Sequence, residues 1–125
     1  MKKCKIQYPN SKFFVEIKLF DTVKELQKAV KEKTCAGMYR PNGVVIYPKR
    51  KVYPKLGTIY LAKEKLGCGL ISHEVFHCSM DYANKKFNIG SVRTGNNERQ
   101  EDIAYFHGYI VKEIINWLND NNLWK

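Results

Sequence analysis

Two histidines and a glutamate stand in the run His73-Glu74-Val75-Phe76-His77, which is an HExxH motif. On a helix, the two imidazoles of this motif lie one turn apart on one face, with the carboxylate beside them. Proteins build hydrolytic zinc sites in this way, with two histidine ligands and a glutamate as general base. A buried pair of core histidines is the alternative, but it carries a desolvation cost that metal ligation relieves. The motif therefore predicts a Zn²⁺ site at His73 and His77, with Glu74 as catalytic base.

A catalytic zinc ion takes three protein ligands and keeps one position open, so a third ligand must lie elsewhere in the chain. The metzincin continuation is absent, because Met80 and Ala83 stand where that class has glycine and histidine. We favour Glu101, because the small residues Ala104 and Gly108 share its helix face and permit a close approach to the HExxH helix. A solvated glutamate near a helix N-terminus is the alternative. The other candidates on this segment are Glu98, Asp102 and His107.

Three further residues are candidates for supporting roles. Tyr105, one turn beyond Glu101, and His107 are both candidates for stabilising the transition state. Tyr105 is equally suited to packing, and His107 projects about 120° away from Glu101. Asp81 continues the row of the two histidines by one more turn, so it is a candidate to accept a hydrogen bond from the other ring N–H of His77 and orient that imidazole. An exposed aspartate is equally compatible with that position.

The N-terminal half of the chain predicts a strand followed by a helix. Between Ser11 and Phe20, apolar residues alternate with charged ones, as in a half-buried strand. Asp21 can cap a helix from Thr22 to about Lys33, in which apolar residues recur at three- and four-residue spacing. The alternating apolar residues of the strand are Val15, Ile17 and Leu19.

The middle of the chain predicts two more strands. Thr34 to Asn42 is expected to be a loop, because it contains Gly37 and Pro41. Strands are expected over Gly43 to Tyr47 and over Thr58 to Ala62, where apolar and β-branched residues cluster.

Two helices complete the expected fold. The HExxH helix should run from about Leu70 to Lys85, and after a connection over Phe87 to Asn97 a long helix should run from about Glu98 to Asn119. The buried stripe of the long helix is expected to be Ile103, Phe106, Ile110, Ile114 and Trp117. The chain is thus expected to form one α+β domain, residues 1–125, with a minimal zincin-like fold: a three- to four-stranded sheet packed with an N-terminal helix, a central HExxH helix and a long C-terminal helix.

HEVFH is followed 24 residues after His77 by the glutamate of EDIAYFHGY, which is Glu101. This stretch resembles small gluzincin metallopeptidases, in which a glutamate on the next helix completes the HExxH site. It is similar to the ImmA/IrrE type and to short proteins of phages and mobile elements with an E-x-x-A-Y-x-x-G pattern. The resemblance covers about Thr58 to Tyr109. The chain departs from the ImmA/IrrE pattern at Tyr105 and Gly108, where that type usually has asparagine and alanine.

The resemblance implies a zinc peptidase whose ion is held by His73, His77 and Glu101, with Glu74 as general base. It also implies that the strand over Thr58 to Ala62 borders the cleft and pairs with an extended peptide.

The charge of the chain suggests a second kind of partner. Lysine and arginine number 22 against 12 acidic residues, a formal charge of +10 that favours polyanions. Lys49, Arg50, Lys51 and Lys55 crowd one short stretch that reads as an exposed loop, so they are candidates for contact with nucleic acid. Solubility alone is the simpler explanation of the charge.

Composition indicates the setting of the protein. The N-terminal residues include no apolar signal segment and the chain has no long apolar run, so we expect a cytoplasmic protein without a membrane span. The four cysteines are widely spaced and are expected to be reduced thiols, with Cys78 in the core.

These features leave three functions open. The leading hypothesis is a zinc-dependent hydrolase of the gluzincin kind that cleaves an unidentified protein or peptide. The second is a non-catalytic, zinc-stabilised binding protein whose basic surface engages nucleic acid or an acidic partner; retention of Glu74 argues against it, because a structural site needs no base. The third is a protease that also associates with DNA. The oligomeric state is left open by the sequence.

Overall fold

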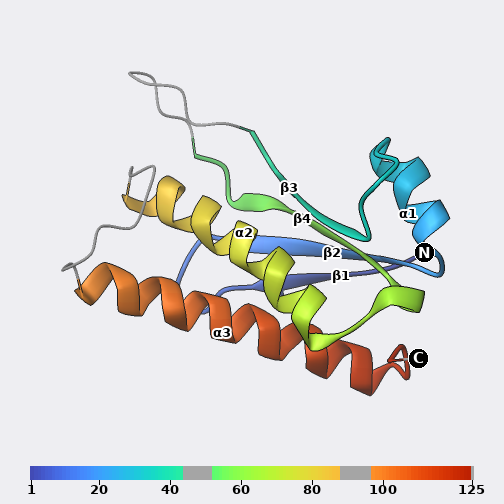
Figure 1. Ribbon diagram of the computed structural model, residues 1–125. Helices are drawn as coiled ribbons and strands as arrows, with labels where there is room; N and C mark the ends of the chain where they lie inside the picture. Colours follow the sequence, from blue (N-terminus) through green and yellow to red (C-terminus); the bar gives the residue numbers. More distant parts are fainter. Residues whose placement is uncertain (44–51, 88–96, 125) are drawn as a thin grey trace.

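A computed structural model describes residues 1–43, 52–87 and 97–124, and these form an α+β fold with a four-stranded mixed sheet and three α-helices (Figure 1). The elements in chain order are β1 (Lys2–Gln7), β2 (Phe14–Phe20), α1 (Val23–Val30), β3 (Gly37–Pro41), β4 (Lys55–Ala62), a 3₁₀ turn (Lys63–Lys65), α2 (Cys68–Phe87) and α3 (Asn97–Asp120).

The order of strands in the sheet is β1-β2-β4-β3. β1 and β3 form the two edges, each antiparallel to its neighbour, while β2 and β4 pair in parallel at the centre. More side chains are buried on the two central strands than on the edge strands, since each central strand has a partner on both sides within the sheet.

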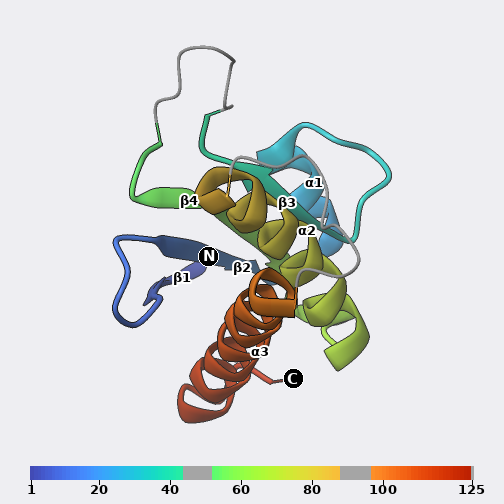
Figure 2. The same cartoon turned by 90° about the vertical axis from the view of Figure 1, so that its left-hand side faces the viewer.

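Helices cover both faces of the sheet. α2 and α3 lie side by side and run in opposite directions across one face (Figures 1 and 2), and together with the inward side chains of the strands they enclose the main core. α1 packs through Leu26 and Val30 on the other face, against Ala62 and its neighbours. The fully buried large side chains of the main core include Tyr82, Phe106, Ile17, Leu56, Ile59, Leu61, Ile71, Ile110, Ile114 and Leu118.

The three expected helices are present with shifted ends. Thr22, and not Asp21, caps α1: its hydroxyl accepts from the Glu25 N–H at 3.1 Å. α1 ends at Val30, because Lys31 adopts a left-handed conformation with φ of 61°. α2 begins two residues before Leu70, so Cys68 and Gly69 belong to the helix and not to a break before it.

The strands differ more from expectation. β2 contains the expected alternating residues and β4 contains the strand expected over Thr58 to Ala62, but β1 was not foreseen, and the expected loop over Thr34 to Asn42 contains the edge strand β3. Of the strand expected over Gly43 to Tyr47, only Gly43 lies within the described residues, and its φ is +81°.

No helix in the described ranges is both long enough and apolar enough to cross a membrane. Each of the four cysteines is a free thiol, and Cys78 is buried in the core as expected.

Candidate metal centre

Helix α2 places His73 and His77 on its outer side. The helix buries its opposite side, including Ile71 and Tyr82, against the sheet, and this leaves both histidines exposed. Their Nε2 atoms approach to 3.3 Å, with the rings nearly perpendicular at 83°. The predicted one-turn spacing therefore brings the two imidazoles together.

The distance between the two nitrogens fits a shared metal ion. In a tetrahedral site, zinc–nitrogen bonds of about 2.0–2.1 Å hold two ligand nitrogens roughly 3.3–3.4 Å apart. An N–H···N hydrogen bond between neutral imidazoles is the alternative, and 3.3 Å is long for such a bond. The two histidines are thus arranged as two ligands of one ion.

Glu74 lies beside the histidines but is buried, with 5% of its surface exposed. Its carboxylate and the two imidazoles offer ligand atoms that all lie within 4.8 Å of one another. Burial raises the pKa of this carboxyl above its usual value, and the electrostatic influence of His73 and His77 and a hydrogen bond from the Tyr39 backbone N–H oppose that rise.

Strand β3 holds the Glu74 carboxylate from the other side. A Cβ added at Gly37 would lie 3.2 Å from Oε2 of Glu74 and 3.1 Å from Leu70, so a residue without a side chain permits this close approach. Gly37 and Tyr39 are functional candidates that the sequence analysis missed. The sequence held one sign of this edge strand. The segment GMYRP ends in a proline, and proline within a sheet is found on edge strands.

The outer edge of β3 faces the same site. The Asn42 N–H donates to the Leu56 carbonyl at 2.7 Å, which fixes the alternation of hydrogen-bonded pairs along β3 and β4. By that alternation, the backbone groups of Gly37, Tyr39 and Pro41 point away from β4. Proline at one of these outward positions loses no bond to β4, because its missing N–H would have pointed outward.

A cavity of about 460 Å³ lies between β3 and α2, next to the histidines. It is lined by Gly37, Met38, Tyr39, Pro41, His73, Glu74, His77 and Asp81. The strand that borders it is therefore β3. The expectation that the strand over Thr58 to Ala62 would border the cleft and pair with a peptide is wrong, because β4 is paired on both sides, with β2 and with β3.

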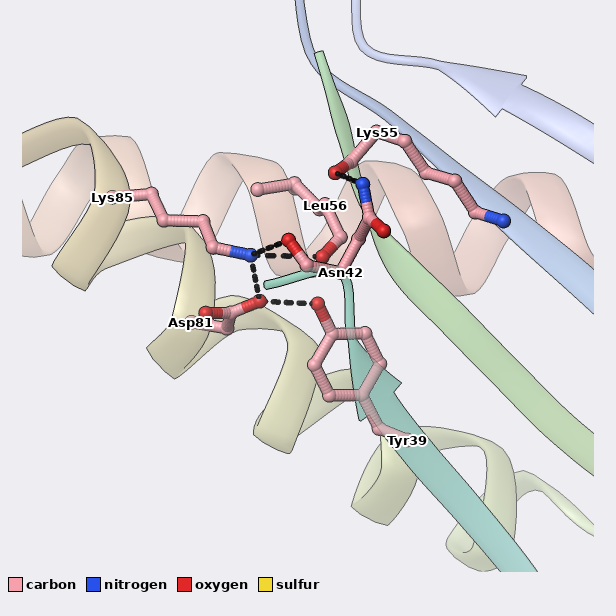
Figure 3. A network of polar contacts seen from close by, with 6 residues as sticks. All are labelled: Tyr39, Asn42, Lys55, Leu56, Asp81 and Lys85. Atoms are coloured by element: carbon pink, nitrogen blue, oxygen red, sulfur yellow. Dashed lines mark hydrogen bonds and ion pairs between the residues drawn. The ribbon is translucent and has the colours of Figure 1, made fainter. Parts of the chain in front are cut away.

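Asp81 joins a buried polar network behind the cavity (Figure 3). Its Oδ2 accepts from the Tyr39 hydroxyl at 2.5 Å and from Lys85 Nζ at 2.9 Å. Lys85 also donates to the carbonyls of Leu56 at 2.9 Å and Asn42 at 3.4 Å. The hydrogen bonds of Asp81 thus fix β3 against α2, and the expected role of orienting His77 is not among them.

Glu101 is not brought to the histidines. It is exposed and lines a separate cavity with Tyr8, Glu98, Asp102 and Tyr105. The face of α3 that docks is the one with Ile103 and Phe106, and Glu101 lies about 140° around the helix from Phe106. A Cβ on Gly108 would meet nothing within 4 Å, so the small residues expected to allow close helix contact face open space.

The other candidates on α3 also lie away from the metal centre. His107 sits between the helices, 3.3 Å from the Ser72 hydroxyl and 3.2 Å from that of Ser79, and burial lowers its pKa. Tyr105 is 70% exposed. Asp102 accepts from the Tyr82 hydroxyl at 2.6 Å and pairs with Lys86. Neither His107 nor Tyr105 lines the cavity beside the histidines, so this arrangement does not support their predicted role as transition-state helpers.

The described residues include every histidine, cysteine, aspartate and glutamate of the chain, because residues 44–51, 88–96 and 125 contain none of them. Within the described ranges, the group of three or more such side chains that is close enough to share an ion is His73, Glu74 and His77. Of the basic cluster, Lys49, Arg50 and Lys51 lie outside the described residues, and Lys55 lies 3.5 Å from Glu16.

Comparison with known proteins adds no relative: no family model, no curated protein and no solved structure matches this chain.

Proposed function

We propose that the protein is a metal-dependent peptidase in which His73 and His77 supply two of the ligands of Zn²⁺ and Glu74 is the general base. The observation that carries this proposal is the pair of imidazole nitrogens, 3.3 Å apart on the protein surface, with a buried carboxylate beside them. When bound, zinc would lower the pKa of a coordinated water toward 7 and polarise a peptide carbonyl.

Glu74 suits the role of proton acceptor. Its carboxylate accepts a hydrogen bond from the Tyr39 backbone N–H of β3 and lies beside both imidazoles. Its position is therefore held relative to β3 and to the histidines. Burial raises the pKa of its carboxyl, which makes the carboxylate a stronger acceptor of the proton from the attacking water.

The edge strand β3 suits the role of substrate guide. The outward backbone groups of Gly37 and the outward carbonyl of Tyr39 border the same cavity as the histidines, and an extended peptide can pair with such an edge, while the Tyr39 N–H is used by Glu74. A peptide bound in this way would enter the cavity that His73 and His77 line.

Metal analysis tests the proposal. Purified wild-type protein is expected to contain about one zinc ion per chain, and His77→Ala is expected to lose it, because one imidazole alone is a weak ligand set. His107→Ala is the matched control: it removes a histidine that lies between α2 and α3 and should leave the metal in place. Wild-type protein that neither contains zinc nor takes it up would refute the metal centre.

Glu101→Ala is expected to leave the zinc content unchanged, because Glu101 lines a different cavity from the histidines. This result is opposite to the one that a gluzincin ligand set would give. Elemental analysis after dialysis against a weak chelator distinguishes the two. Metal loss in Glu101→Ala as complete as in His77→Ala would mean that α3 docks differently when the ion is bound.

A non-catalytic metal site is the second candidate function. The observation that favours it is that the described chain brings two imidazoles together but no third histidine, cysteine or carboxylate besides Glu74. Zinc binding without any cleavage of a peptide library would support this candidate over the peptidase.

A further inference from the structure

One of the two faces of the sheet is not covered by α2 or α3. The inward side chains of β1, β2 and β4 contact those helices, and the side chains between them point to the opposite face. At one end of that face lies α1 (Figure 1), which packs on Phe20, Met38, Tyr60 and Ala62. The remainder, which we name the open sheet face, carries Lys3, Lys5, Phe14, Glu16, Lys18 and Lys55, with Tyr60 and Arg40 at its border with α1.

The open sheet face is strongly basic. Five of its side chains are cations, whereas Glu16 is the one acidic residue in the four described strands. Glu16 lies 3.7 Å from Lys18 and 3.5 Å from Lys55, so it offsets part of this charge and no more.

Two of these cations are placed where they reduce stability. Lys3 and Lys18 are direct cross-strand neighbours, and like charges opposite one another in a sheet are destabilising. An anionic partner that contacts both lysines would offset this repulsion, so the pair suggests a binding role for this surface.

Aromatic rings lie among the cations. Lys5 Nζ is 4.2 Å from the ring centre of Phe14, and the Tyr60 ring has Lys18 at 5.8 Å and Arg40 at 5.9 Å. Two rings thus lie among cations that come from all four strands, on one face of the sheet.

We propose that the open sheet face binds single-stranded nucleic acid. Cations on such a surface track the phosphates, and rings such as Phe14 offer planes on which unpaired bases stack. A duplex presents its phosphates but hides the faces of its bases, so it can use only the cations. The site is separate from the metal centre, which lies between α2 and β3.

Fluorescence anisotropy with a short labelled oligothymidylate tests the charge requirement. The variant combines Lys3→Gln, Lys5→Gln and Lys18→Gln, and the control removes the same charge from exposed helix positions with Lys24→Gln, Lys28→Gln and Lys112→Gln. The first is expected to weaken binding about tenfold or more and to reduce the slope of log affinity against log salt by about 2, whereas the control changes affinity about twofold at most.

Phe14→Leu tests the ring. It keeps an apolar side chain but removes the stacking plane, so it should weaken binding of the single strand about fivefold or more and leave binding of a matched duplex unchanged. His77→Ala should bind the oligonucleotide as wild type does, which separates this site from the metal centre.

The proposal is overturned if wild-type protein fails to bind the oligonucleotide at low salt or if the two lysine triples lose affinity equally. It is overturned as well if Phe14→Leu has no effect, because the surface would then recognise polyanions in general. The thermal midpoint of each variant separates loss of binding from loss of folding, because the lysine triple removes the Lys3–Lys18 repulsion together with the Lys18–Glu16 ion pair, and Phe14→Leu tests the surface independently.

Discussion

Glu74→Gln is expected to abolish peptide hydrolysis while zinc content stays at the wild-type level. The amide keeps an oxygen that can accept the Tyr39 N–H, so the position of the side chain against β3 is retained. It cannot accept a proton, however, and general-base catalysis contributes about 10²–10⁴ in rate. The two histidines, which carry the proposed ligand atoms, are untouched.

Cleavage of a mixed peptide library, followed by mass spectrometry, measures this effect alongside elemental analysis of the same preparations. Glu98→Gln is the matched control, because it makes the same change at an exposed glutamate on α3. Hydrolysis that survives in Glu74→Gln at the wild-type rate would rule out Glu74 as the base. Loss of both metal and hydrolysis would instead make Glu74 a ligand.

The HExxH helix could be predicted from the sequence because its information is local. The spacing of the motif and of the apolar residues around it defines both the helix and the face that carries the histidines. The pairing of His73 with His77 follows from helix geometry alone, and the 3.3 Å approach of their nitrogens agrees with it.

The edge strands could not be predicted in this way, because their stability comes from partners distant in sequence. β3 has five residues with glycine and proline at its ends, and its strand character depends on pairing with β4. β1 is rich in lysine, and only Ile6 is buried. Short, charged, proline-containing strands are typical of sheet edges, where their composition discourages aggregation.

The sequence also failed to predict which face of α3 packs on the rest of the protein, and this face determines where Glu101 lies. The helix carries an apolar stripe with Ile103 and Phe106 and a separate row of small residues, Ala104 and Gly108, and sequence reasoning assigned the contact to the small residues. Burial of Phe106 and the open space at Gly108 show that the apolar stripe makes the contact. Hydrophobic area removed from water outweighs the advantage of close backbone approach.

Lys85→Met is expected to lower the free energy of unfolding by about 3–5 kcal/mol, because it breaks a buried ion pair on one side only. The Lys85 side chain is 4% exposed and that of Asp81 is 15% exposed, so the aspartate would be left with a charge that water screens poorly. The carbonyl of Leu56 would lose one of its two donors as well and keep the Asn42 N–H. A natural domain is stable by only about 5–15 kcal/mol, so this loss is a large part of the total.

Lys86→Met is the matched control for this experiment. Lys86 is the next residue of the same helix and is also ion-paired, with Asp102, but its side chain is 39% exposed. Exposed pairs contribute about 0–1 kcal/mol, so a small change is expected. Urea unfolding of both variants measures the difference.

Because Lys85 links α2 to the start of β4 and to the residue after β3, its loss should also loosen the strand that holds Glu74 (Figure 3). Equal losses in the two variants would mean that Lys85 does not fix β3 against α2.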